Sequence, residues 1–274
     1  MLVTASGRLI DLSAPVVMGI LNITPDSFFD GGQHFDVDAA LRQAEKMLRE
    51  GAAFLDLGGA SSRPGAIEVS ESEELSRVIP VVETIIRTFP DVLISIDTWR
   101  ARVAREAALA GASIINDISA GRMDAQLFPT VAELKLPYVL MHMQGTPSNM
   151  QKAPEYEDVV TEVLDFLITK IAELHALNIY DIILDPGFGF GKSVAHNFEL
   201  LKNLHVFSTV TGLPVLAGIS RKSMICKTLG IKPADALNGT TALHMVALQQ
   251  GASILRAHDV KEAVEVIQLW KALN

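Results

Sequence analysis

The chain has a single cysteine, Cys226, and contains no long apolar run. One cysteine excludes an internal disulfide and a metal site built from several thiolates, and its apolar neighbours indicate a buried structural thiol. No run approaches the roughly 20 apolar residues of a membrane-spanning helix, and the first residues lack a basic start followed by an apolar core. We therefore expect an unexported, cytoplasmic protein with no membrane partner.

The chain also lacks an excess of positive charge. Its formal net charge is −9 and its isoelectric point is about 5.3, and no run of Lys and Arg provides a local exception. Nucleic acids and anionic membranes attract clustered Lys and Arg, so we expect no nucleic-acid partner. A small anion in a locally basic pocket is still compatible with this composition.

The composition instead indicates one large core. Of 274 residues 49% are apolar and 20% charged, and no linker or low-complexity tract divides the chain. We expect a single domain over residues 1–274. Near its start, the segments 2–4 and 8–12 flank a turn signal and predict a small β-hairpin that caps the floor of the domain.

Eight short apolar runs alternate with segments of helical periodicity. The runs are 16–21, 54–57, 93–96, 113–115, 139–141, 182–184, 215–217 and 254–255, and the predicted helices are 37–50, 73–87, 101–109, 126–134, 158–177, 197–204, 237–250 and 261–273. This alternation is typical of parallel strands joined by crossover helices, and eight units predict an α/β fold, the closed (β/α)8 TIM barrel.

Each run ends in polar residues, and in such a barrel the loops after the strands form the active-site face. We therefore expect one pocket to collect Asn22, Ser61, Asp97, Asn116, Asp185, Ser220, Lys222, Arg256 and His258. The loops 24–36 and 61–71 are long for a compact barrel, which favours binding segments that cover the pocket.

The loops after the seventh and eighth strands are the usual phosphate-binding region of this fold. Here they supply Lys222, Arg256 and His258. Arginine offers a planar fork for phosphate oxygens and histidine can add a donor, so Arg256 and His258 could bind a mono- or diphosphate. Alternatively, Arg256 pairs with a barrel carboxylate and His258 caps the next helix.

Asp97, Asn116 and Asp185 end the third, fourth and sixth strands. A carboxylate can accept two parallel hydrogen bonds from an amidine-like edge, and the amide adds a donor and an acceptor, so the three could bind a flat heterocycle by its edges. Two alternatives stay open: a structural ion network of both aspartates with Lys222 and Arg256, or a role as metal ligands or acid and base.

The segment 185–192 alternates glycine and phenylalanine, which suits a backbone close to a ligand with an aromatic face beside it. It lacks the spacing of a Walker phosphate loop. Met141 and Met143 offer a soft packing surface at the end of the fifth strand, and His142 between them is expected to be a satisfied core histidine.

Eight motifs of this sequence together resemble those of the bacterial dihydropteroate synthase family, in the family's order and over nearly the whole chain. They are 22–28, 61–65, 96–98, 115–117, 141–145, 185–192, 220–223 and 256–260. The resemblance implies a pterin-binding barrel that condenses (7,8-dihydropterin-6-yl)methyl diphosphate with 4-aminobenzoate, giving 7,8-dihydropteroate and diphosphate in folate biosynthesis. It also implies a homodimer and a sulfonamide target.

The same resemblance assigns site residues. The pterin ring would be held by Asp97, Asn116, Met141, Asp185, Phe190, Gly218, Lys222 and Arg256. Diphosphate would be bound by Asn22, Ser62, Arg63, Arg256, Ala257 and His258, with Asn22 also binding the Mg²⁺ cofactor. The aminobenzoate would lie against Phe28, Pro64, Phe190, Ser220 and Lys222. The catalytic residues would be Asp97, Lys222, Arg256 and His258.

In the mechanism that the resemblance implies, positive charge develops on the pterin and negative charge on the leaving diphosphate. Loss of diphosphate leaves a cationic methylene on the pterin, so Mg²⁺, Arg256 and His258 would offset charge on the leaving group while Asp97 stabilises the cation. The amine of aminobenzoate then attacks. No covalent enzyme intermediate is needed, which agrees with the lack of an activated nucleophile.

The chain departs from the family pattern at three positions. Ala60 stands where the family usually has Glu, Ser62 where it has Thr, and Ala257 where it often has Val. Ser62 keeps the hydroxyl, whereas Ala60 removes a carboxylate. Two alternatives are a non-catalytic pterin-binding protein, for which Ala60 is the only support, and a corrinoid-linked methyltransferase, which would not need a diphosphate site.

Overall fold

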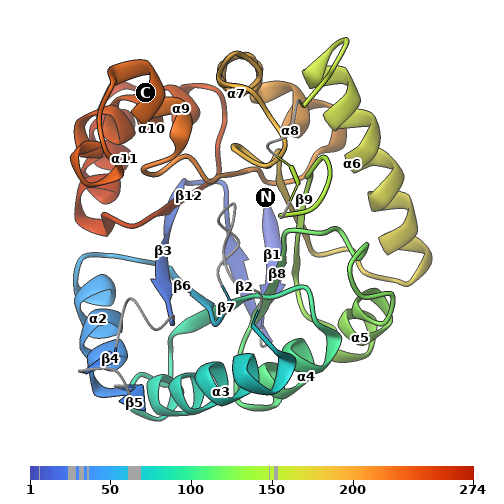
Figure 1. Cartoon of the computed structure of the whole chain (residues 1–274), viewed down its shortest axis with the longest axis vertical. Helices are drawn as coiled ribbons and strands as arrows, with labels where there is room; N and C mark the ends of the chain where they lie inside the picture. Colours follow the sequence, from blue (N-terminus) through green and yellow to red (C-terminus); the bar gives the residue numbers. More distant parts are fainter. Residues whose placement is uncertain are drawn as a thin grey trace.

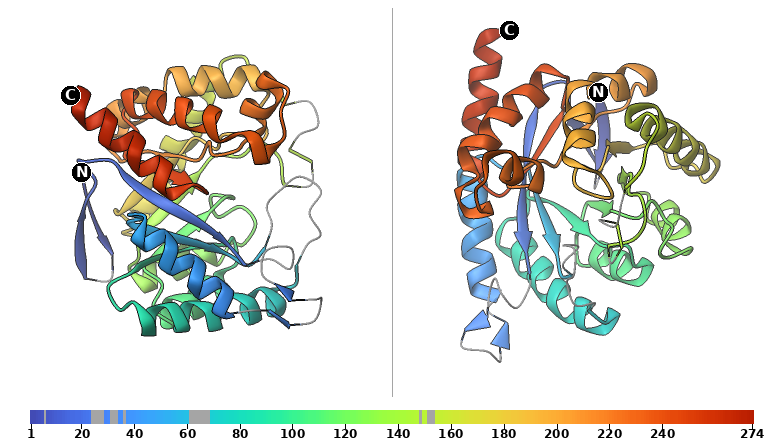
Figure 2. Two further views of the ribbon diagram at one scale, coloured as in Figure 1. Left: turned by 90° about the vertical axis from the view of Figure 1, so that its left-hand side faces the viewer. Right: turned by 45° about the horizontal axis from the view of Figure 1, so that its top comes forward.

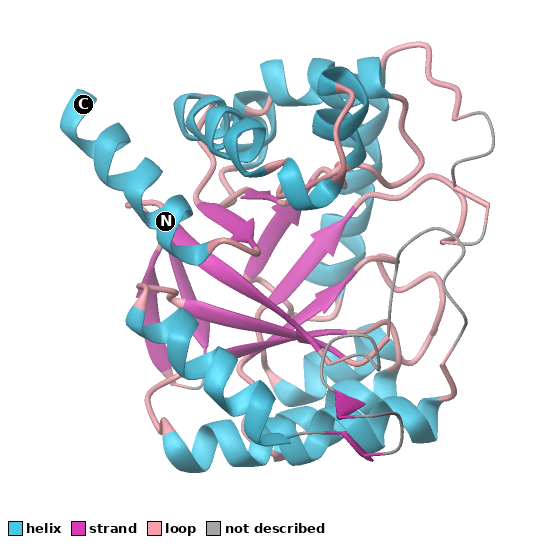
Figure 3. Cartoon of the chain, turned by 60° about the vertical axis from the view of Figure 1, so that its left-hand side comes forward, coloured by secondary structure: helices cyan, strands magenta, loops and turns pink. Residues whose placement is uncertain are grey.

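The computed structural model describes all residues except 6, 24–28, 31–33, 36, 61–68, 148 and 151–153, and it describes only the backbone at 29–30 and 34–35. Eight parallel strands lie at the centre with helices around them (Figures 1 and 3). The strands are β3 (Val16–Asn22), β6 (Phe54–Gly58), β7 (Leu93–Asp97), β8 (Ile114–Asp117), β9 (Tyr138–Met141), β10 (Ile182–Asp185), β11 (Leu216–Ala217) and β12 (Ile254–Ala257).

The strand order closes the sheet into a barrel. Neighbours run β10-β9-β8-β7-β6-β3-β12-β11, and a parallel bridge between Leu184 and Val215 joins the two ends. The Leu184 N–H donates to the Pro214 carbonyl oxygen at 2.9 Å across this junction. The predicted TIM barrel is confirmed.

The helices follow the predicted alternation. They are α2 (Val37–Arg49), α3 (Glu71–Thr88), α4 (Ala101–Leu109), α5 (Leu127–Leu134), α6 (Val159–Ala176), α7 (Val194–Lys202), α8 (His205–Thr211), α9 (Ser223–Leu229), α10 (Leu237–Gln249) and α11 (Val260–Leu273), with a short 3₁₀ helix, η1 (Pro233–Asp235), before α10. No helix within the described part of the chain is long and apolar enough to cross a membrane.

The largest boundary error concerns α7, which begins three residues before the predicted segment 197–204. The Ser193 side chain accepts from the His196 N–H, and the His196 ring accepts from the Ser193 N–H, so a capping box fixes an earlier start. The helices α8 and α9 and the antiparallel pair β4 (Phe29–Asp30) and β5 (His34–Phe35) are additional to the prediction. Each is too short for periodicity to reveal.

The barrel interior is apolar at one end and polar at the other. Successive side chains of a strand point to opposite faces, so residues two apart share a face. An apolar layer near the strand starts consists of Met18, Phe54, Ile114, Val139, Ile183, Leu216 and Ile254. Two residues further along six of these strands stand Asp56, Asn116, Met141, Asp185, Gly218 and Arg256. The second layer is therefore mostly polar and lies toward the carboxyl ends of the strands.

The predicted N-terminal hairpin is present and closes the floor. Strand β1 (Leu2–Ala5) pairs antiparallel with β2 (Arg8–Asp11), at one end of the barrel (Figure 2). Val3, Ala5 and Leu12 are buried in the same cluster as the apolar layer. The Thr4 N–H also donates to Asp181 Oδ1 at 3.0 Å, beside the start of β10.

The outer faces of the strands pack against the helices in one large core cluster. At Gly19 in β3 a Cβ atom would lie 3.0 Å from both Met47 Sδ and Val260 Cγ2. Glycine at this position therefore lets α2 and α11 approach the strand closely. The hairpin thus covers the amino-terminal end of the barrel, and the helices pack closely on its outer face. The polar end, at the carboxyl ends of the strands, is the end that the hairpin leaves uncovered.

Leu12 should contribute strongly to stability, because it is only 2% exposed within the floor cluster. We expect Leu12→Ala to lower the free energy of unfolding by about 3 kcal/mol in urea denaturation, through lost transfer energy and a residual cavity. Leu9→Ala is the matched control in the same hairpin, since Leu9 is 65% exposed, and should cost less than about 0.5 kcal/mol. Equal effects of the two substitutions would show that the hairpin does not plug the core.

Candidate active site

Asp56 is the centre of a hydrogen-bonded cluster in the polar layer. Arg256 Nε donates to Asp56 Oδ2 at 2.6 Å, and the Nη2 atom of the same guanidinium lies 2.9 Å from Asp97 Oδ2. Asn116 Nδ2 approaches both Asp56 oxygens, at 3.2 and 3.1 Å. Ser95 Oγ donates to Asp56 Oδ1 at 2.6 Å. Four strands therefore meet through one carboxylate whose side chain has no exposed surface.

Asp56 is not among the site residues predicted from the sequence, because it lies inside the apolar run 54–57 and not at its end. The signal was present: residues 54, 56 and 58 share a face, and a lone carboxylate in a buried strand must find a charged or donor partner. Its partner comes from β12, 200 residues further along the chain. The cross-barrel pairing could be found only after the strand order was known.

Two carboxylates face one guanidinium in this cluster. Burial raises the pKa of Asp97, an effect that Arg256 opposes and Asp56 reinforces. Burial lowers the pKa of Arg256, but Asp56 and Asp97 together raise it above its ordinary value. Two carboxyl groups thus share one guanidinium where burial disfavours a second negative charge, which favours a ligand edge that donates hydrogen bonds or carries positive charge.

The contacts of Arg256 and His258 distinguish between the alternatives that the sequence left open. Arg256 does pair with barrel carboxylates, and it joins Asp97 in an ion network. His258 does not cap the next helix, because Asp259 occupies that position. Instead the His258 N–H donates to Ser220 Oγ at 3.2 Å, and the same oxygen lies 3.0 Å from His258 Nδ1. The loops after β11 and β12 are therefore in direct contact.

Asp185 and Lys222 form a second part of the polar end. Asp185 is buried, and its Oδ1 accepts from the Gly187 N–H at 2.7 Å. Burial raises the pKa of Asp185, against the effect of Lys222. Lys222 Nζ donates to the Phe188 carbonyl oxygen and lies 4.7 Å from the centre of the Phe190 ring. Burial lowers the pKa of Lys222 to about 8.

Gly218 keeps space open between these two groups. A Cβ atom at this position would lie 3.6 Å from Asp185 Oδ2 and 3.7 Å from Lys222 Nζ. A side chain at this position would therefore lie in contact with both polar atoms. A planar ligand could reach the Asp185 carboxylate here with the Phe190 ring beside it.

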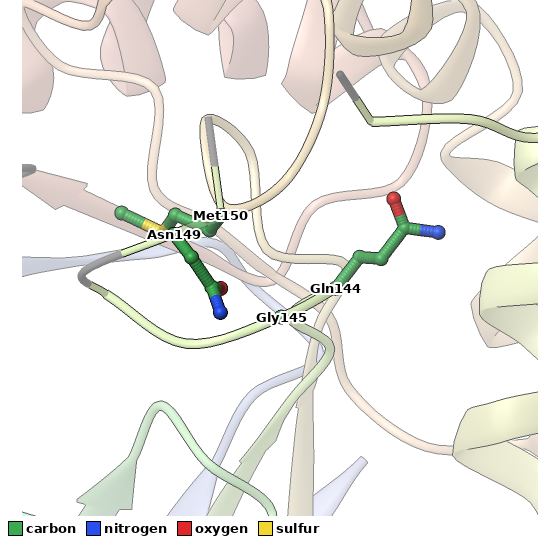
Figure 4. Close-up of a pocket in the computed structure, with 4 residues that line it drawn as sticks. All are labelled: Gln144, Gly145, Asn149 and Met150. Carbon is green, nitrogen blue, oxygen red and sulfur yellow. The ribbon is translucent and has the colours of Figure 1, made fainter. Parts of the chain in front are cut away.

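An apolar cluster borders this end of the barrel. It contains Ile118, Met141, Met143 and Met150, with Trp99 and Phe190 packed against it. Met150 also lines a pocket in the loop after β9, together with Gln144, Gly145 and Asn149. Figure 4 shows the Gln144 side chain directed away from Asn149 and Met150, and its Nε2 donates to the Glu155 carbonyl oxygen. The predicted methionine surface is thus continuous with Phe190.

Lys192 supports the glycine- and phenylalanine-rich loop from within. It is only 3% exposed. Its Nζ donates to the carbonyl oxygens of Gly187 at 2.9 Å and Phe190 at 3.0 Å, and lies 2.9 Å from His142 Nδ1. Burial and the charge of Lys192 lower the pKa of His142 to about 2, so the ring is neutral and its Nδ1 can accept. His142 is the satisfied core histidine that the sequence predicts.

The remaining predicted residues fall into three groups. Asn22 is half-buried at the end of β3, where it pairs in register with Gly58. The Ala257 side chain packs in the outer core, which leaves only its backbone for a ligand. The rest of the predicted residues, together with most of the two long loops, lie outside the described part of the chain: Phe28, Ser61, Ser62, Arg63 and Pro64.

One end of the barrel therefore presents three kinds of surface. Buried carboxylates and an amide suit a hydrogen-bond-donating edge, methionine and phenylalanine suit a flat ring, and Lys222, Arg256 and His258 suit an anion. The arrangement can hold a planar heterocycle that carries an anionic substituent.

Comparisons with known proteins agree with this description. The family described as "pterin binding enzyme" matches residues 18–258. The dihydropteroate synthase of Haemophilus influenzae is 51% identical over 271 residues, which cover 98% of this chain and 97% of the relative.

Solved structures show the same likeness. The Yersinia pestis dihydropteroate synthase with a sulfonamide drug complex has a TM-score of 0.94 at 48% identity, covering 100% of this chain and 99% of that one. The Xanthomonas albilineans dihydropteroate synthase in complex with 7,8-dihydropteroate has a TM-score of 0.89 at 41% identity, covering 100% and 98%.

We expect Asp56→Asn to destabilise the fold by about 3 kcal/mol, because it leaves the buried Arg256 guanidinium short of compensating charge. Urea denaturation at neutral pH measures the change. Glu133→Gln is the control, since Glu133 pairs with Arg105 at 2.5 Å with its side chain 62% exposed, and it should cost less than about 1 kcal/mol. A loss at Asp56 no larger than this control would contradict its central role.

Proposed function

The chain belongs to the pterin-binding enzymes, among the dihydropteroate synthases, and from this premise we propose how its residues share the reaction. It is a transferase of folate biosynthesis that condenses (7,8-dihydropterin-6-yl)methyl diphosphate with 4-aminobenzoate and releases diphosphate. One observation supports the proposed division of roles. The cluster of Asp56, Asp97 and Arg256 lies at the same end of the barrel as Asp185 and Lys222.

We propose that Asp185 binds the pterin by two parallel hydrogen bonds from its amino group and adjacent ring N–H. The space beside Gly218 supports this role, because Asp185 Oδ2 borders it. Asn116 and Lys222 complete the polar contacts, and Met141 and Phe190 flank the ring. Two carboxyl groups facing one guanidinium in the cluster suit a ring that becomes cationic.

Arg256 and His258 bind the diphosphate in this proposal, with Ser62, Arg63 and the backbone at Ala257 as further contacts. When the bond between the methylene carbon and the diphosphate oxygen breaks, the electron pair leaves with the oxygen. The two cationic or donor side chains stabilise that charge, while Asp97 stabilises the pterin methylene cation electrostatically. Asp97 Oδ2 lies 2.9 Å from Arg256 Nη2, so the group that stabilises the pterin cation is adjacent to one that stabilises the leaving diphosphate.

The aminobenzoate amine then forms the new C–N bond and loses its proton. We propose that the aminobenzoate lies between Phe190 and Lys222 and near Ser220, with Phe28 and Pro64 as the further contacts that the family resemblance implies. The 4.7 Å separation of Lys222 Nζ from the Phe190 ring supports this, because it places a cation beside an aromatic surface. No step requires a nucleophilic side chain.

The site also fits a magnesium ion that arrives with the diphosphate. Mg²⁺ is usually held by one or two protein oxygens together with substrate phosphates and waters. Asn22 offers one carboxamide oxygen at the end of β3, and among the described residues no group of three His, Cys, Asp or Glu side chains could hold a metal alone. When bound, Mg²⁺ offsets negative charge on the departing diphosphate.

We further propose that residues 1–274 act as one domain, that the enzyme is a cytoplasmic homodimer, and that sulfonamides compete for its aminobenzoate site. The drug-bound Yersinia pestis relative supports the last of these. The other three rest on the sequence analysis.

Diphosphate release by the purified protein tests the function directly. With the pterin diphosphate and Mg²⁺, we expect release that depends on 4-aminobenzoate, together with a product of dihydropteroate mass. Tight pterin binding without either signal would instead make the chain a binding protein. Methyl transfer from a folate to a corrinoid protein would establish the methyltransferase alternative.

Asp185→Asn should weaken pterin binding by about 1.5 to 3 kcal/mol, because it removes one charge-assisted acceptor at the ring edge. Isothermal titration with the bare pterin measures the loss. Asp181→Asn is the control: Asp181 lies just before the other end of β10 and accepts from the Thr4 N–H, far from the polar layer. Unchanged affinity in the Asp185 variant would remove this residue from the site.

A further inference from the structure

Two residues beside the proposed diphosphate site form an ion pair that the reaction scheme does not use. Arg221 lies between Ser220 and Lys222, and Asp259 follows His258. Arg221 Nε donates to Asp259 Oδ2 at 2.9 Å, and Nη2 lies 2.7 Å from Oδ1. The Nε–Nη2 edge of the guanidinium thus meets both carboxylate oxygens, and this bidentate geometry gives the pair directional specificity.

The backbone at Arg221 is held in a conformation that this residue type rarely adopts. Its φ is +55°, in the left-handed region, which costs an L residue free energy unless its surroundings compensate. The Arg221 N–H donates to Thr240 Oγ1 at 3.1 Å, and Nη1 donates to the carbonyl oxygens of Pro233 and Ala234 at 3.1 and 3.2 Å. The turn is therefore fixed by contacts of Arg221 itself.

The Asp259 side chain pairs with Arg221 and does not cap its own helix. Asp259 stands at the N-cap of α11, where a carboxylate commonly accepts from the first helical N–H groups, yet its side chain makes no capping hydrogen bond. The hydrogen bond from Arg221 is the largest cause that lowers the pKa of Asp259. Both side chains are partly buried, 27% and 19% exposed, so solvent screens the pair less than a surface pair.

The pair spans the two loops that carry the proposed anion-binding groups. On one side of Arg221, Ser220 contacts His258. On its other side, Lys222 donates to the Phe188 carbonyl oxygen. A shift of the loop after β11 relative to that after β12 would change the separation of Lys222 from Arg256 and His258.

We propose that Arg221 and Asp259 are positioning residues that hold the Ser220–Lys222 turn against the Arg256–His258 segment, so that both loops face one diphosphate group. The inference rests on the proposed function, in which Arg256 and His258 bind diphosphate. It predicts that breaking the pair impairs diphosphate binding and turnover more than pterin binding, because only Lys222 among the proposed polar contacts of the pterin belongs to this turn.

A double-mutant cycle tests the pair, with Arg221→Met, Asp259→Asn and the double variant. We expect each single substitution to raise the Kd of inorganic diphosphate roughly tenfold and to lower kcat by a similar factor. The double variant should be no worse than either single one, because both remove the same contact. The Kd of the bare pterin should rise less than that of diphosphate, since Asn116 and Asp185 lie outside the turn, and this difference separates positioning from a general structural loss.

Two further comparisons isolate the cause. Arg221→Gly accepts the left-handed backbone without strain, whereas Arg221→Ala does not, so both should lose diphosphate affinity while the alanine variant is also less stable. Arg221→Lys keeps the charge but not the fork and should recover part of the affinity. Arg105→Met is the matched control, since it breaks the Arg105–Glu133 pair between α4 and α5 and should leave all constants unchanged.

Additive effects in the cycle, wild-type constants in Arg221→Gly, or equal losses for diphosphate and bare pterin would overturn the proposal. A wild-type protein without turnover would contradict the proposed function instead. The cycle on inorganic diphosphate binding would still decide the role of the pair, so the two failures are distinguishable.

Discussion

The fold and the site both depend on a carboxylate placed where water cannot reach it. Asp56 projects into the middle of a barrel whose lower layer is entirely apolar, and an isolated ion there would be prohibitively unfavourable. Arg256 compensates it from across β3, and Asn116 and Ser95 satisfy its remaining acceptor capacity. One consequence is that Arg256 and Asp97 are aligned before any substrate arrives. The charged groups at the reaction centre therefore need little reorganisation, the condition under which electrostatic stabilisation is strongest.

Two lysines, Lys192 and Lys222, hold the loop after β10 at the place where we propose that the pterin ring binds. Lys192 holds the Gly187 and Phe190 carbonyls from within, and Lys222 holds the Phe188 carbonyl beside the Phe190 ring. Backbone proximity requires glycine here, since a Cβ at position 187 would lie 1.8 Å from the His142 carbonyl oxygen. The loop predicted to present an aromatic surface is thus held by hydrogen bonds from both lysines, which fix the position of Phe190.

Much of this architecture could be predicted from local patterns, and what could not depends on distant pairings. Periodicity identified the eight strands, the hairpin and most helices, because each extends over enough residues to repeat. The polar residues that end strands, such as Asp97 and Asp185, could be placed on one face by the barrel rule alone. Asp56 was missed since it stands inside a strand, and its role depends on Arg256, 200 residues away. The contacts of Lys192 and the pairing of Arg221 with Asp259 likewise follow from how loops meet in space, which spacing along the chain does not encode.

The plugged floor has a consequence for how the chain reaches its native state. Val3, Ala5 and Leu12 complete a cluster that includes Leu216 and Ile254, and the Val16 N–H donates to the Ser253 carbonyl oxygen at 3.0 Å. The hairpin is synthesised before β11 and β12, so its apolar surface is not fully covered until those two strands are in place. Contacts between residues so far apart in the sequence slow folding, because the chain must close a long loop before these contacts contribute stabilising free energy. Until the two segments meet, the apolar side chains of the hairpin are incompletely covered, and such exposed surface favours aggregation of a partly folded chain.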